Sequence, residues 1–268
     1  MLLVDFGKQP RRSPNRNDRL SALISAAAKT DFYRTWLTAD VPASPFNLEL
    51  LPYIEIGDFY GHKPDFLNRY APRAVSRELN YPIQQPPKIA VLADGFRRTA
   101  HVRMFADFEL EEIAQLDTET IAAPVEMLRR LAKIVRPQQF PLVAFTGIPH
   151  GLLTDSDRNL FWKAYGVPVF EQFCGLEGEV LAEECEAHDG LHIRTGEALF
   201  EQRGAEIVIS SFANLQYPVL RLATGFIGHI DDRCCPCGRP GERLSSVRRK
   251  PRKSTAQDWS GELLEAVS

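Results

Sequence analysis

Three cysteines and one histidine have the side-chain chemistry and the spacing to hold a metal ion. Cys185 and His192 begin and end the segment Cys-Glu-Ala-His-Asp-Gly-Leu-His, and Cys235 and Cys237 enclose Pro236 in a short loop. Structural zinc sites use four thiolate or imidazole ligands arranged as a tetrahedron. We therefore expect a structural zinc site that joins these two loops and, with all four positions filled by protein, activates no water.

Two further residues compete for a place in this ligand set. His188 can replace His192, and Cys234 can replace a neighbouring cysteine. His192 is favoured because it begins a predicted strand, whereas His188 lies in the polar turn before it. The alternative to a metal site is a group of free cysteines beside two exposed histidines. The chain has 5 cysteines in 268 residues, and their clustering favours metal over a secreted disulfide framework.

Hydrophobic patterning predicts the elements that position these ligands. Buried-strand patterns alternate with a helix that Pro124 opens and a helix that Thr154 caps and Gly166 ends. This alternation indicates an α/β fold with parallel strands joined by crossover helices. Short strands then predict a β-rich, zinc-stapled region after residue 190. The predicted strands cover residues 88–92, 142–145, 168–170, 191–193, 206–210, 219–222 and 226–230.

These patterns divide the chain into five parts. Residues 1–17 are polar and basic and are expected to form a disordered leader, after which Asp18 is the predicted N-cap of the first helix. The remaining parts are a helical N-terminal segment (18–87), an α/β core (88–182), a β-rich zinc-binding region (183–244) and a polar tail (245–268).

Composition and charge restrict the class of protein. The formal net charge is −3, which provides no positive field for nucleic acid or an anionic membrane. No run of about 18 apolar residues is present, so no transmembrane helix is expected. We expect a cytoplasmic globular protein with Trp36 and Trp162 in its core. Residues 94–99 are either an anion-binding turn at the end of a strand or a solvated loop.

Three motifs, in this order, resemble the phenylacetate–coenzyme A ligase branch of the adenylate-forming enzymes. They are Glu-Cys-Glu-x-x-Asp-Gly-Leu-His-Ile at 184–193, Arg-x-x-Thr-Gly at 221–225 and Cys-Pro-Cys-Gly-Arg at 235–239. The similarity extends over residues 18–244, with a large internal gap. It implies a partial adenylate-forming N-terminal domain and a structural metal at the Cys/His set. It also implies pocket remnants at Thr146, Gly147, Cys174, Gly175, Thr224 and Gly225.

The departures from this family concern its ATP-binding parts. No Ser/Thr/Gly-rich phosphate loop precedes the strand at 88–92. Cys174, Glu177 and Gly178 occupy the positions of the family's tyrosine, threonine and magnesium-binding glutamate, for which Glu179 is a possible substitute. Phe226 replaces the ribose-binding aspartate, and an aromatic ring accepts no ribose hydroxyl bonds. After residue 244 we expect a polar tail where the family has its lysine-bearing domain.

Two hypotheses follow from these departures. In the first, the chain is a degenerate, non-catalytic relative of the ligases that serves as a zinc-stapled binding or partner subunit, without ATP or magnesium. In the second, it is a divergent acid–thiol ligase, AMP-forming, that is completed in trans by another chain. The expected partners are a protein or a second copy of the chain, and a small carboxylic acid or coenzyme A-type ligand.

Overall fold

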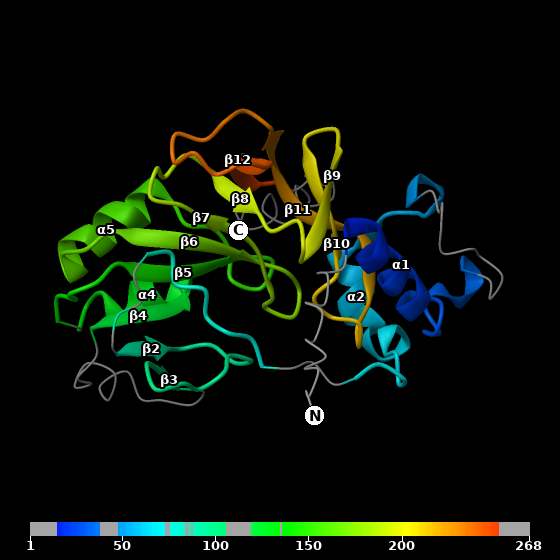
Figure 1. The fold of residues 1–268 in the computed structure, drawn as a ribbon, viewed down its shortest axis with the longest axis horizontal. Coiled ribbons are helices and arrows are strands. Elements are labelled where there is room, and N and C mark those ends of the chain that lie inside the picture. The colour runs from blue at the N-terminus through cyan, green and yellow to red at the C-terminus, as the bar shows by residue number, and fades with distance from the viewer. Residues whose placement is uncertain are drawn as a thin grey trace, which may run out of the picture.

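A mixed sheet of twelve strands runs through the part of the chain that the structure, a computed structural model, describes (Figure 1). That part comprises residues 15–37, 48–72, 76–83, 86, 88–105, 119–134 and 136–251. One half of the sheet is parallel, and its strands are neighbours in a fixed order. In that order they are β3 (Val102–Met104), β2 (Ile89–Val91), β4 (Thr120–Pro124), β5 (Leu142–Gly147) and β6 (Val169–Cys174).

Two helices connect the parallel strands, as the sequence predicts. Helix α4 (Val125–Leu131) joins β4 to β5, and helix α5 (Asp155–Tyr165) joins β5 to β6. Thr154 and Asp157 form the expected capping box, and Gly166 ends α5 with φ of 73°. The parallel strand–helix architecture is therefore confirmed. Strand β4 was not predicted, because its Ala-Ala-Pro end has low β-propensity and Pro124 resembles the first residue of a helix.

The other half of the sheet is antiparallel and continues from β6 without a break. β7 (Val180–Glu184) and β8 (Leu191–Ile193) lead to β12 (Arg243–Arg249), and β11 (Val219–Asp231), β10 (Glu206–Ser211) and β9 (Ala198–Arg203) follow. The segments predicted at 219–222 and 226–230 are one strand, with a register shift opposite β12 between Ile227 and His229.

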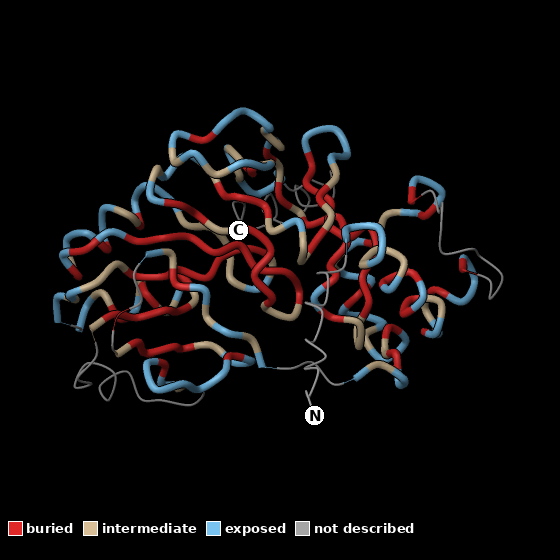
Figure 2. Tube along the Cα trace, viewed as in Figure 1, coloured by how far each residue is buried: buried red, intermediate tan, exposed pale blue. Residues whose placement is uncertain are grey.

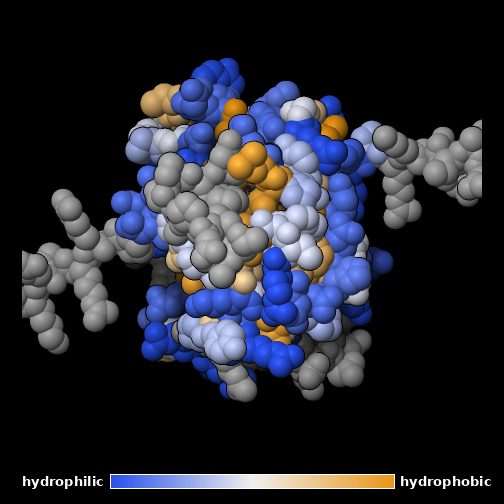
Figure 3. Space-filling view, turned by 90° about the vertical axis from the view of Figure 1, so that its right-hand side faces the viewer, coloured by the Kyte–Doolittle hydropathy of each residue, from blue (hydrophilic) through white to orange (hydrophobic). Residues whose placement is uncertain are grey.

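The N-terminal residues pack against the antiparallel half. They form α1 (Arg16–Ala27), the short strand β1 (Ile54–Glu55), which pairs with β11, and α2 (Ile56–Gly61). Single 3₁₀ turns occur at Tyr33–Thr35, Leu48–Leu50 and Lys63–Phe66. On the face at the right-hand side of Figure 1, the surface is mostly hydrophilic, with a few separate hydrophobic areas (Figure 3).

Both predicted ends of the ordered chain need correction. Asn15, not Asp18, caps α1, and Asp18 is the N3 partner that completes the capping box, so the helix begins inside the predicted leader. At the other end, residues 245–249 belong to β12 rather than to a polar tail, because they pair with β11. Lys250 donates to Glu206 Oε2 at 2.6 Å. The remaining predicted leader (1–14) and tail (252–268) lie outside the described residues.

Every residue of the two central parallel strands, β5 and β6, is buried (Figure 2). Side chains on the two faces of these strands pack into separate hydrophobic clusters, one under α4 and α5 and another around Phe145 and Phe96. The prediction that both tryptophans lie in the core is wrong: Trp36 is 44% exposed and Trp162 is 59% exposed. Among the described residues, no helix is long and apolar enough to cross a membrane.

Candidate metal centre and ligand cleft

Four side chains from two loops and one strand converge beside the middle of the sheet. Cys185 directly follows β7, His192 is the central residue of β8, and Cys235 and Cys237 lie in the loop between β11 and β12. Their ligand atoms all lie within 4.8 Å of one another. These are the four residues that the sequence singled out, and together they can hold a metal ion.

The distances within the group suit tetrahedral coordination. The sulfur atoms of Cys185 and Cys235 are 3.7 Å apart, and Cys237 Sγ is 3.4 Å from His192 Nε2. Zinc–sulfur bonds of about 2.3 Å and zinc–nitrogen bonds of about 2.0 Å give a sulfur–sulfur separation of about 3.8 Å and a sulfur–nitrogen separation of about 3.5 Å in a tetrahedron. The donor set and these two distances therefore fit a four-coordinate ion.

Backbone contacts hold the cysteine loop in this position. Gly238, with φ of 80°, donates its N–H to Cys235 O at 2.9 Å and closes a tight turn. Arg239 N–H donates to Cys237 Sγ at 3.4 Å, a contact that stabilises a thiolate. Opposite the loop, His192 pairs with Arg243 in the β8–β12 ladder, so the imidazole is fixed by the sheet.

The structure also decides between the alternative ligands. His188 lies outside the group: its Nδ1 is 2.9 Å from Glu184 Oε1, and its ring packs on Phe170. Cys234 is exposed and is not among the four converging residues. The backbone of His188 has φ of 50°, in the left-handed region that few residues other than glycine adopt.

Burial sets the protonation of the group. It lowers the pKa of His192, and the nearby charges of Arg239 and Arg243 lower it further, so the imidazole is neutral at pH 7 and free to coordinate. Burial raises the pKa of the Cys185 thiol to about 11. A metal cation is the group that would reverse this rise, because coordinated thiols are deprotonated.

The residues predicted as pocket remnants lie in two places. Four of them meet where β5 pairs with β6, with Thr146 opposite Phe173 and Gly147 opposite Cys174, and Gly175 following. Thr224 and Gly225 lie on β11. Thr146 donates its hydroxyl to Glu171 Oε1 and Thr224 donates to Ile207 O, each at 2.7 Å. None of the six lines the cavities described below.

The residues that the sequence comparison singled out as departures from the ligase family are engaged in contacts within the protein. Cys174 is 1% exposed, and burial raises the pKa of its thiol. Glu179 accepts hydrogen bonds from Ser211 Oγ at 2.8 Å and from the backbone N–H of Glu177 at 2.9 Å, and burial raises its pKa. The ring of Phe226 packs edge-on against Phe173, with centroids 5.7 Å apart.

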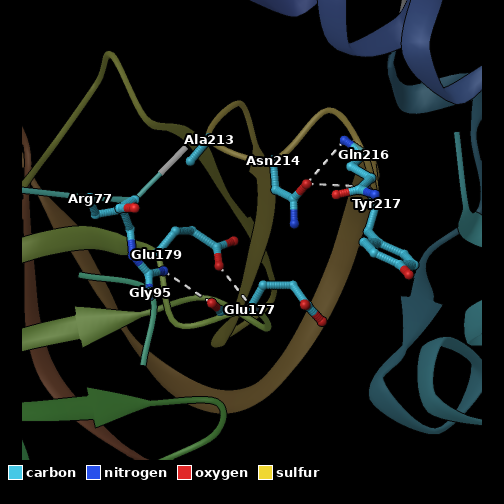
Figure 4. Close-up of a pocket in the computed structure, with 9 residues that line it drawn as sticks. Arg77, Gly95, Glu177, Glu179, Ala213, Asn214, Gln216 and Tyr217 are labelled. Carbon is cyan, nitrogen blue, oxygen red and sulfur yellow. Dashed lines mark hydrogen bonds between the residues drawn. The ribbon is translucent and has the colours of Figure 1, made fainter. Parts of the chain in front are cut away.

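A cleft lies at the carboxyl end of the parallel strands, where open α/β sheets bind their ligands. Three cavities occupy it, of about 230, 330 and 260 Å³, and Arg77 lines all three. Polar residue types line most of the first, among them Glu177, Asn214 and Tyr217 (Figure 4). The second is bounded by Phe96, Phe145 and His150.

Sequence reasoning did not identify Arg77. Its partners come from the loop after β2 and the loop after β6, and no spacing rule connects them. The only signals in the sequence were two glycines, Gly95 and Gly178. In the structure both have positive φ and border the arginine. Residues 94–99 are predicted to form either an anion-binding turn or a solvated loop. In the structure this segment is bonded to the backbone of Arg77: Arg77 N–H donates to Gly95 O, and Arg97 N–H donates to Arg77 O.

Several solved structures of 2-hydroxyisobutyryl-CoA ligase have this architecture. The open conformation of 2-hydroxyisobutyryl-CoA ligase, in complex with 2-HIB-AMP and CoA, matches 87% of this chain and 68% of its own length, with a TM-score of 0.63 and 15% identity. The structure of its thioesterification state matches 91% of this chain and 70% of its own length, with a TM-score of 0.63 and 17% identity. Its postadenylation state with R3-HIB-AMP matches 88% and 67%, with a TM-score of 0.61 and 15% identity.

The chain thus has the fold of about two thirds of an acyl-CoA ligase. No protein-family model matches the sequence, and no curated protein is similar to it. At this level of identity the likeness concerns the fold, and the residues of the site must be interpreted from their own contacts.

Proposed function

We propose that this chain is a degenerate relative of the phenylacetate–coenzyme A ligases, without ATP-dependent acyl activation of its own, that acts as a binding or partner subunit. The observation that supports this proposal most strongly is the state of Glu179, the substitute for the magnesium-binding glutamate. Its carboxyl group is buried and already accepts two internal hydrogen bonds. Magnesium binds through carboxylate oxygens and keeps several waters. A buried carboxyl group whose two oxygens already accept internal hydrogen bonds is poorly placed to hold it.

The contacts of Cys174 and Phe226 support the same proposal. Both side chains are packed into hydrophobic clusters, where a nucleotide would need polar partners. Adenylyl transfer depends on positioning and on charge neutralisation, and removal of one such element reduces rates by about 10²–10³. Loss of several ATP-binding elements together leaves a scaffold that can still bind. The ligand would be a small carboxylic acid or a coenzyme A-type molecule, and the partner would be a second copy of the chain or another protein.

Isothermal titration of the full chain with ATP and magnesium tests the proposed loss of activation. We expect no measurable heat of binding up to millimolar nucleotide, and no pyrophosphate release with a panel of aryl and aliphatic acids. ATP binding in the micromolar range would contradict the proposal.

We also propose that the ion held by the four ligands is zinc and that its role is structural. The donor set of three thiolates and one imidazole is one that zinc prefers, and it leaves no position open for a reacting water. Burial of three of the four ligands is consistent with a site that stabilises the fold.

Replacement of one ligand tests the zinc site. Cys235→Ser should no longer bind one zinc per chain, and its melting temperature should fall by more than about 5 °C. The reason is that the free energy of zinc binding contributes directly to the free energy of folding in such sites. The matched control is Cys234→Ser, the adjacent exposed cysteine, which should retain both metal and stability. If Cys235→Ser keeps one zinc per chain, the ligand assignment is wrong.

A second candidate function is a divergent ligase-type enzyme that is completed by another chain. The cavity of about 330 Å³ at the carboxyl end of β4 and β5 favours it, because its size is that of a small-molecule site. Thioester formation from an acid, ATP and coenzyme A, seen only when a partner protein is added, would support this function. Absence of product across a broad acid panel with the partner present would exclude it.

A further inference from the structure

One cation, the guanidinium group of Arg77, lies where the three cavities of the cleft meet. These cavities border the loops that follow β2 and β6, and Arg77 is the only residue that lines all three. Its Nη1 donates to Glu177 O and its Nη2 donates to Asp94 O, both at 3.0 Å. The side chain therefore bridges two loops that are distant in sequence, and it places a positive charge at the centre of the cleft.

The surrounding residues leave a space shaped for this side chain. A Cβ atom at Gly95 would lie 2.6 Å from Arg77 Nη2, and one at Gly178 would lie 3.3 Å from it. Both glycines have positive φ, of 78° and 76°, so a larger residue would be strained as well as obstructed. The ring of Phe96 supports the guanidinium from one side at 5.1 Å.

The guanidinium of Arg77 forms no ion pair among the residues that the structure describes, although its charge acts on the nearby buried carboxyl of Glu179 and opposes the rise in its pKa. Both of its bonded partners are neutral carbonyl groups, no described carboxylate lies within ion-pair distance, and its Nε atom is buried without a partner. The carboxylate of Glu177 pairs with Lys63 Nζ at 2.7 Å, and Figure 4 shows its side chain running from Arg77 toward Tyr217. An anion would bind this guanidinium more strongly than the two carbonyls do.

The cavity of about 330 Å³ joins this cation to an apolar wall. Phe96 and Phe145, whose rings stack at 5.0 Å, lie on it together with Leu92 and Leu176. His150 lines the same cavity, and burial, assisted by the charge of Arg77, lowers its pKa. At pH 7 the imidazole is therefore neutral, so one ring nitrogen can donate a hydrogen bond and the other can accept one.

We propose that this cavity binds a small amphiphilic anion, with an apolar body against Phe96 and Phe145 and an anionic group on the Arg77 guanidinium. The inference rests on the proposed binding role of the same cleft, and it adds the class of ligand and the residue that recognises it. Recognition requires neither nucleotide nor metal in the cleft. Carboxylate, sulfonate and phosphate groups share the necessary chemistry.

Titration of the zinc-loaded full chain with four benzene derivatives tests this proposal and separates the head groups. The ligands are phenylacetate, benzenesulfonate, phenyl phosphate and the neutral phenylacetamide, and the ¹⁵N resonance of the Arg77 side chain reports the contact. At least one anion should bind roughly 10- to 100-fold more tightly than the amide and shift the Arg77 Nε resonance. Equal affinity for the amide and every anion, or no binding of any anion at millimolar concentration, would overturn the proposal.

Two variants identify the residues responsible. Arg77→Gln should remove the preference for anions, whereas Arg97→Gln, an exposed arginine of the neighbouring loop, should retain it. Since Arg77 also bridges two loops, Ala93→Phe provides an independent test: it fills the cavity while the guanidinium remains, and it should abolish binding of anion and amide alike. Unchanged anion affinity in Ala93→Phe would place the ligand elsewhere.

A third variant tests the sign of the electrostatics. Asp94 lines the same cavity and is exposed, so its negative charge opposes an anionic ligand. Asp94→Asn should raise anion affinity by about 2- to 5-fold and leave amide affinity unchanged. A separate ATP titration of the same sample keeps the two proposals apart. ATP binding contradicts the proposed loss of acyl activation, whereas equal affinity for anions and amide contradicts only the proposed anion site.

Discussion

Asp157 shows how one side chain can serve two neighbouring helices. It completes the capping box of α5 by accepting from the backbone N–H and the hydroxyl of Thr154, at 2.8 and 2.7 Å. It also accepts two hydrogen bonds from Arg129 of α4, at 2.7 and 2.8 Å. Arg129 lowers the pKa of this carboxyl to about 2, and the bonds from Thr154 act in the same direction.

The shift of Asp157 predicts a pH-dependent contribution to stability. Its ordinary pKa is 3.8, so the stabilisation is complete above about pH 4 and is lost as the pH falls toward 2. Asp157→Asn should therefore lower the free energy of unfolding by about 1–3 kcal/mol at pH 7. Urea unfolding of the wild type and of Asp157→Asn between pH 7 and pH 3 measures the difference in their free energies of unfolding. This difference should become smaller as the pH falls.

Asp155 is the matched control for this experiment. It lies in the same first turn of α5 but is exposed, so Asp155→Asn should change the free energy of unfolding by less than about 0.5 kcal/mol. A difference between wild type and Asp157→Asn that stays constant from pH 7 to pH 3 would show that the carboxylate charge is not the cause.

Single elements of this fold depend on backbone conformations that the sequence encodes locally. Gly166 ends α5 in the left-handed region, with φ of 73°, and a Cβ atom there would meet only Pro137 Cβ at an ordinary 3.9 Å. The cost of a side chain at this position is therefore conformational and not steric. Gly57, inside α2, has no atom within 4 Å of a built Cβ and no positive φ.

Alanine substitution at these two glycines should have opposite effects. Gly166→Ala should destabilise the protein by about 1 kcal/mol, because a left-handed backbone is unfavourable for alanine. Gly57→Ala should stabilise it by about 0.5–1 kcal/mol, because alanine restricts the unfolded chain and favours a helix. Equilibrium denaturation measures both changes, and a stabilising Gly166→Ala would contradict the C-cap.

The candidate metal centre lies where the two halves of the sheet meet. β8 is only three residues long and pairs with β12 through two residue pairs, yet it is the link between the parallel strands and β9–β11. The four candidate ligands flank this junction, so a bound ion would reinforce one of the shortest pairings in the sheet. Arg243 adds a second connection, from β12 to Asp189 at 2.7 Å.

Removal of the metal should therefore loosen the middle of the sheet before its parallel edge. After treatment with a chelator, hydrogen exchange should accelerate first in β8 and β12, while β5 and β6, which are buried throughout, keep their protection. Readdition of zinc should restore the slow exchange. Uniform acceleration across all strands would show instead that the ion supports the molecule as one cooperative unit.

The sequence by itself determined the features that depend on neighbouring residues. The capping box at Thr154, the glycine that ends α5 and the alternation of buried strand and helix are short-range signals, and the structure contains each of them. The four converging ligands were also predictable, because few residue types can bind a metal and these cluster in two short segments.

Only the tertiary structure decided the order of the strands and the composition of the cleft. β7, β9 and β12 become strands through pairing with partners that no local pattern specifies. His192 is distinguished from His188 because its place in the sheet fixes the direction of its side chain. Arg77 meets Asp94 and Glu177 because the ends of parallel strands converge at one edge, a consequence of topology that sequence spacing does not record.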